Sequence, residues 1–135
     1  MIVLSEQTKQ SIEQAFHRSL RASLTRAPAD VCAIAPASGS GEFGPSGEIL
    51  LVVTLSSFVF RLLTLFQVRE DAATRAYYVG VAEQSLDEAF REFANMCCGA
   101  LNRELSQQIP HLAMSIPYSL GSQCLEFLEI GRAHV

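Results

Sequence analysis

Apolar positions recur with helical spacing at the start of the chain and gather into strand-like runs in its middle. A helix is predicted over residues 5–25, where four apolar residues are spaced to share one face: Ile12, Phe16, Leu20 and Leu24. Ser5 is a suitable N-cap, and Pro28 ends the helix because the residue before a proline avoids helical dihedrals. A short strand is expected at 30–36, followed by a loop rich in Gly, Ser and Pro at 37–47.

Residues 48–68, "EILLVVTLSSFVFRLLTLFQV", allow two interpretations. The run has enough apolar residues for a membrane-spanning helix. Against this, Arg61 would lie inside the span at a cost of about 2.5–3.5 kcal/mol, and the serine pair at 56–57 interrupts it as a hairpin turn would. We favour a β-hairpin of strands 48–55 and 58–68, since β-branched and aromatic residues abound. Both faces of these strands are apolar, so we expect both to be covered.

The second half of the chain again places helix before strand. In order, it predicts helices over 69–80 and 85–109 and strands over 111–119 and 122–129. Gly80 ends the first helix, Pro110 ends the second, and Gly121 lies in the turn between the strands. Together the elements predict one α+β domain in which an antiparallel sheet packs against two long helices.

Composition restricts the function classes. A chain of 135 residues suits one domain with one core. The net charge of -4, with no Lys/Arg cluster, argues against nucleic acid as a partner. The first residues lack the basic and apolar regions of a signal peptide, so we expect a cytoplasmic protein. The four cysteines, at 32, 97, 98 and 124, have no C-x-x-C spacing, so we expect reduced thiols and no metal site.

The last residues, "IGRAHV" at 130–135, are treated separately from the fold. Their codons would match a common adapter sequence at the end of sequencing reads, which makes them an artefact to exclude from fold reasoning. We therefore assign the domain to 1–129 and expect the natural chain to continue past about Glu129. One or more C-terminal strands of the sheet would then be missing from this chain.

The helix over 85–109 carries the candidate functional residues, and it begins with the capping-box pattern S-x-x-E. At about 100° per residue, its core stripe consists of Leu86, Phe90, Phe93, Cys97 and Leu101. The opposite, polar stripe consists of Glu88, Glu92, Asn95, Gly99 and Asn102. Glu92 and Asn95 are three residues apart and project side by side, and Gly99 leaves bare backbone that another molecule could approach. Any solvated helix face has the same general character, so the stripe alone does not define a site.

This stripe resembles the motif of the CheC/CheX/FliY family of chemotaxis phosphatases. Their signature is Asp or Ser, three residues, Glu, two residues, Asn, about twenty-two residues and Pro. Here it reads Glu88, Glu92, Asn95 and Pro117, with twenty-one residues between the asparagine and the proline. The order of helices and strands is also similar, up to about Glu129. Glu88 replaces the usual Asp or Ser and the proline spacing is one residue short, but the Glu–Asn pair is intact.

The resemblance implies hydrolysis of the aspartyl phosphate of a receiver domain such as CheY. The receiver would hold Mg²⁺ and the phosphoryl group, so no cofactor is expected in this chain. Asn95 would enter the receiver's site and orient a water molecule, and Glu92 would pair with the receiver's active-site lysine. Glu88, Gly99 and Asn102 would contact the receiver. The chain has no third asparagine that could build a second Glu–Asn pair in the first helix, so the resemblance implies one site per chain.

Three function classes remain open at the level of sequence. The first is a response-regulator phosphatase. The second is a receiver-binding or flagellar-switch module of the same fold without turnover, and the third is a membrane-associated protein built on residues 48–68. Besides the receiver, a second copy of the chain is expected as a partner, paired through the sheet edge or the apolar sheet face. Neither nucleic acid nor a membrane is expected as a partner.

Overall fold

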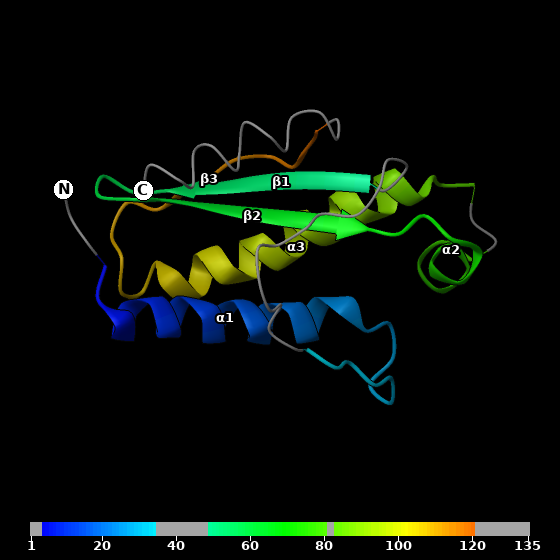
Figure 1. The fold of residues 1–135 in the computed structure, drawn as a ribbon, viewed down its shortest axis with the longest axis horizontal. Coiled ribbons are helices and arrows are strands. Elements are labelled where there is room, and N and C mark those ends of the chain that lie inside the picture. The colour runs from blue at the N-terminus through cyan, green and yellow to red at the C-terminus, as the bar shows by residue number, and fades with distance from the viewer. Residues whose placement is uncertain (1–3, 35–48, 81–82, 121–135) are drawn as a thin grey trace.

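A computed structural model describes residues 4–34, 49–80 and 83–120 of the chain. Its elements are α1 (Glu6–Leu24), β1 (Ile49–Ser56), β2 (Arg61–Val68), α2 (Ala72–Tyr78), α3 (Leu86–Leu105), β3 (Ala113–Met114) and β4 (Tyr118–Ser119). The class is α+β, as predicted, and the two long helices lie on one face of an antiparallel sheet (Figure 1). The strand predicted at 122–129 and the tail at 130–135 lie outside the described residues.

Helix α1 follows the predicted range closely. Ser5 caps it, because its Oγ accepts a hydrogen bond from the Thr8 N–H at 3.1 Å. The predicted apolar face turns toward the core, with Ile12 buried and the three later members of that face partly buried. Ala15 and Ser19 are also buried, and such small side chains let α1 pack closely against α3.

The middle of the chain is a β-hairpin. Strands β1 and β2 pair antiparallel from Ile49 opposite Val68 to Ser56 opposite Arg61. Ser57 shapes the turn, since its Oγ accepts from the N–H groups of the second and third residues after it. The interpretation of 48–68 as a continuous membrane-spanning helix is therefore wrong. In the described part of the chain, no helix is long and apolar enough to cross a membrane.

The predicted strand at 30–36 is wrong over residues 30–34, and its last two residues lie outside the described ranges. Asp30 instead accepts a hydrogen bond from the Tyr77 hydroxyl of α2 and another from the Ala27 N–H, three residues earlier in the same loop, at 3.0 Å. Val31 is 94% exposed, and no strand among the described residues pairs with this short apolar run. Strand propensity without a partner strand does not make a strand.

The end of α3 differs from its prediction by one turn. The helix stops at Leu105 rather than near 109, and turns connect it to Pro110. The Ile109 N–H still donates to the Leu105 carbonyl at 2.8 Å, so the chain continues to coil before the proline, which carries no N–H, ends the hydrogen-bonding pattern.

The strand predicted at 111–119 consists of two short pieces separated by a bulge. Three residues, 115–117, lie between Met114 and Tyr118, whereas two residues of β1 lie between their partners in the register. At the bulge, the Thr54 N–H donates to the Ser115 hydroxyl at 2.9 Å instead of to a main-chain carbonyl. The bulge also accommodates Pro117, which has no N–H to contribute to a ladder.

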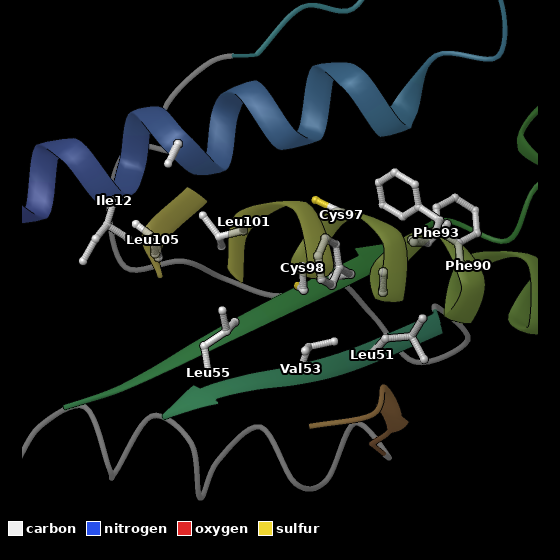
Figure 2. Packing of buried hydrophobic residues seen from close by; sticks show 14 of the residues in the cluster. Ile12, Leu51, Val53, Leu55, Phe90, Phe93, Cys97, Cys98, Leu101 and Leu105 are labelled. Atoms are coloured by element: carbon white, nitrogen blue, oxygen red, sulfur yellow. The ribbon is translucent and has the colours of Figure 1, made fainter. Parts of the chain in front are cut away.

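The core lies between α3 and the sheet (Figure 2). The complete predicted core stripe of α3 is buried, namely Leu86, Phe90, Phe93, Cys97 and Leu101. From the sheet, Leu51, Val53 and Leu55 of β1 point at this helix (Figure 2). Leu50 and Val52 alternate with them on the opposite face and are buried as well, so both faces of β1 are covered, as predicted. For β2 the same prediction is wrong, because Arg61 and Leu63 on one of its faces are exposed.

Candidate functional site

None of the five residues of the predicted polar stripe belongs to the buried core of α3. Glu88, Glu92 and Asn95 are exposed, and Gly99 and Asn102 are partly buried. The helix that presents them is fixed at its start by Ser85 Oγ, which accepts from the Glu88 N–H at 3.1 Å. Since the other side of α3 is locked into the core, this side is held in a single orientation.

Glu92 borders a hollow of about 260 Å³ between α3, α2 and the end of α1. Arg26, which follows α1, is held there because its Nη1 donates to the Tyr78 carbonyl at 2.9 Å. The Arg26 N–H donates to the Tyr77 hydroxyl at 2.9 Å, and the Tyr78 hydroxyl donates to the carbonyl of the last residue of α1 at 3.0 Å. These bonds fasten α2 to the end of α1, so the hollow beside Glu92 has a fixed wall.

Asn95 borders a second hollow, of about 520 Å³, along the same side of α3. Gly99 forms part of its floor, and Arg103 lines it one helical turn further on. Met96 belongs to the lining of both hollows and is 65% exposed. The exposed pair Glu92 and Asn95 is therefore bordered by two hollows, with the apolar side chain of Met96 between them.

Asn102 differs from the other members of the stripe. Its Oδ1 atom is buried and has no hydrogen-bond partner within the described residues. A buried acceptor without a partner costs about 1–3 kcal/mol. In this conformation the carboxamide oxygen faces the protein, while the carboxamide-bearing residue two turns earlier, Asn95, faces solvent.

Pro117, the last residue of the motif, lies beside the first half of α3. The Arg91 Nη1 donates to the Pro117 carbonyl at 3.4 Å, and the same guanidinium binds the Ser119 hydroxyl. Arg91 also pairs with Asp87 through its Nε at 2.7 Å. The bulged strand is thus tied to the helix that carries Glu92 and Asn95, on the flank opposite α1.

The paired cysteines of α3 are buried and belong to the core. Burial raises the pKa of the Cys97 thiol to about 12, and the neighbouring Cys98 adds to the shift. Burial also raises the pKa of Cys98, against a weaker lowering effect of its hydrogen bond with the Thr64 hydroxyl at 3.2 Å. Both thiols are protonated at neutral pH, which does not suit a nucleophile. Across residues 4–34, 49–80 and 83–120, no three His, Cys, Asp or Glu side chains gather into a group that could hold a metal ion.

An apolar groove of about 460 Å³ lies between α1 and β2, away from the polar stripe. Ile12 and Phe16 of α1 line it on one side and Leu63 of β2 on the other, and Lys9 and Glu13 stand at its margin. It carries no cluster of reactive groups, so its chemistry is that of a contact surface.

Three residues of the site were not predicted from the sequence: Arg26, Met96 and Arg103. Two of them had a signal, because at about 100° per residue Met96 and Arg103 fall within a quarter turn of Glu88. Arg26 had none, since it reaches the hollow from a different element. In comparisons with known proteins, no family model matches the chain, and neither a curated protein nor a solved structure matches it significantly.

Proposed function

We propose that this chain is a phosphatase that removes the phosphoryl group from the aspartate of a CheY-like receiver domain in bacterial two-component signalling. The observation that carries the proposal is the Glu92–Asn95 pair. Both side chains are exposed, three residues apart, on a helix whose other side is locked into the core. The proposal also rests on the resemblance of the motif that ends at Pro117 to that of the chemotaxis phosphatases.

The shape of the site supports a protein substrate. Glu92 and Asn95 stand on the outer side of a helix, bordered by shallow hollows, rather than inside an enclosed cavity. A small substrate would leave most of its surface in water here, whereas ligand sites normally enclose most of a small ligand. An exposed helix face can instead dock against the surface of another protein.

The chemistry asked of the chain is positioning. The receiver would supply Mg²⁺ and the phosphoryl group, and the missing part is a water molecule aligned for in-line attack. The Asn95 carboxamide can accept from and donate to that water without adding negative charge beside the phosphoryl oxygens. Glu92 would pair with a lysine of the receiver and fix the register of the helix.

The test is the rate of phosphate loss from phosphorylated receivers of the same genome, in Mg²⁺, with and without the protein. Asn95→Ala should lower the rate enhancement by roughly ten- to a thousandfold, as removal of other preorganised groups does. Because Asn95 is exposed, the substitution should change the protein's free energy of unfolding by no more than about 0.5 kcal/mol. The control Gln107→Ala removes an exposed carboxamide just beyond α3 and should leave the rate unchanged.

Glu92→Lys should lower the rate of phosphate release more than Glu92→Ala does, because the new lysine would repel the receiver's lysine. If Asn95→Ala is as active as the wild type, the assigned mechanism is wrong. If the wild-type protein accelerates phosphate loss from no receiver but still binds one, the domain is a receiver-binding or flagellar-switch module without turnover.

A further inference from the structure

Met96 occupies an unusual place for an exposed apolar residue. Single exposed apolar side chains are common on protein surfaces and need no explanation. Met96, however, follows Asn95 directly and stands between the hollow beside Glu92 and the hollow beside Asn95. Its flexible thioether side chain is 65% exposed and can adapt its shape to an apolar part of another protein.

Each of the two hollows contains one arginine. Arg26 lines the hollow beside Glu92, where its bond to the Tyr78 carbonyl holds it in place. Arg103 lines the hollow beside Asn95. The hollow beside Glu92 carries both signs of charge, because Glu92 and Arg26 line it together, and the hollow beside Asn95 carries the positive charge of Arg103. This arrangement complements a partner surface that is apolar at its centre, with carboxylates opposite the two arginines and a cation opposite Glu92.

We propose that the phosphorylated receiver docks on a surface that extends from α3 across to the C-terminal end of α1. This docking face consists of Arg26, Glu92, Asn95, Met96 and Arg103. The inference rests on the proposed function and adds to it the contacts that hold the receiver. An aspartyl phosphate is itself anionic, and a receiver that binds Mg²⁺ must surround it with carboxylates, so the two arginines meet charges of opposite sign.

The docking face separates binding from chemistry. Met96, Arg26 and Arg103 would contact parts of the receiver that are the same in the ground state and the transition state. Such contacts lower KM and leave kcat unchanged. Asn95 acts on the water in the transition state, so its loss falls on kcat. The two groups of residues are therefore distinguishable by steady-state kinetics.

The experiment measures KM and kcat for release of phosphate from the phosphorylated receiver, together with calorimetric binding of the receiver loaded with beryllofluoride. Met96→Ala and Arg103→Glu should each raise KM and the dissociation constant about tenfold, as loss of a central interface contact does. Values of kcat should stay within about twofold of wild type. Arg26→Glu should also weaken the dependence of KM on salt, because one attractive charge pair is lost.

Two control variants lie at the hairpin end of the sheet, which Figure 1 shows at the opposite end of the molecule from α2. Phe58→Ala removes an apolar side chain that is 88% exposed, and Arg61→Glu reverses an exposed charge. Both should leave KM unchanged. Circular dichroism should show that all five variants fold, since the positions are exposed.

Failure of this inference is distinct from failure of the proposed function. If the wild type accelerates phosphate loss but Met96→Ala and Arg103→Glu keep the wild-type KM, the docking face is wrong and the phosphatase proposal stands. If the wild type binds the loaded receiver without turnover, the phosphatase proposal fails, and the dissociation constants of the same variants still decide the docking face. If the wild type neither binds nor acts on any receiver, both proposals fall.

Discussion

Asn102 is the predicted site residue whose surroundings differ most from those of Glu92 and Asn95. All three belong to one polar stripe by their spacing, yet the Asn102 Oδ1 atom is buried with no partner among the described residues, and Asn95 is exposed. The helical period places side chains around the axis of α3 but does not say how far the neighbouring elements reach. Here the flank of α3 that carries Asn102 is partly covered, and the part that carries Asn95 is open.

Replacement of Asn102 by alanine should therefore stabilise the protein. The change removes a buried acceptor without a partner and introduces the residue that most favours helix. We expect the free energy of unfolding, measured by urea denaturation, to rise by about 0.5–1.5 kcal/mol. Asn95→Ala, at an exposed position of the same helix, is the matched control and should change it by less than about 0.5 kcal/mol. A clear loss of stability in Asn102→Ala would contradict this account.

At the scale of elements, α3 combines a structural side and a candidate functional side. Five of its eight buried residues were predicted, because their apolar side chains recur at helical spacing and this period is a property of the sequence alone. Gly99 interrupts the pattern. In a helix interior, glycine costs up to about 1 kcal/mol relative to alanine, and nothing in the backbone of α3 requires it.

Gly99→Ala should separate stability from function. A Cβ atom at this position would meet the Arg103 Nη1 at 3.6 Å, an ordinary contact, so alanine fits. We expect the free energy of unfolding to rise by about 0.5–1 kcal/mol. If the receiver approaches the bare backbone at Gly99, the same variant should show a raised KM for phosphate release. Stabilisation with an unchanged KM would show that Gly99 is not a substrate-binding residue. The roles proposed for Glu92 and Asn95 would still stand.

At the scale of the whole molecule, the sheet has an edge that bears on self-association. Among the described residues, β2 pairs with β1 alone, and Leu63 of β2 is an apolar side chain with 43% of its surface exposed. An apolar edge strand is a surface on which a second chain can pair. The groove between α1 and β2 adds further apolar surface beside this edge.

Leu63→Lys should reduce association between copies of the chain. A lysine on an edge strand opposes pairing with another strand, because its charge would have to be buried. Sedimentation velocity over a range of concentrations should show a shift toward the monomer. Gln107→Lys adds the same charge at an exposed position just beyond α3 and should not shift the distribution. Equal sedimentation of Leu63→Lys and wild type would exclude this part of β2 from the contact.

The sequence by itself determined the features that depend on neighbours along the chain. The spacing of Ile12 and Phe16 fixed the inner face of α1, Ser85 fixed the start of α3, and the polar stripe with Glu92 and Asn95 followed from the period of the helix. The tertiary structure decided the features that depend on residues far apart. Only the pairing of β1 with β2 excluded the membrane-spanning helix. Among the described residues no strand pairs with 30–34, so the apolar run there forms none.

The same distinction applies within the candidate site. Arg26 and Glu92 are far apart in the chain and line one hollow because hydrogen bonds fasten α2 to the end of α1. The bulge that contains Pro117 likewise arises where β1 and the last strands pair in a shifted register. Local periodicity specifies which way a side chain points from its own helix or strand, whereas the packing of distant segments specifies what it meets there.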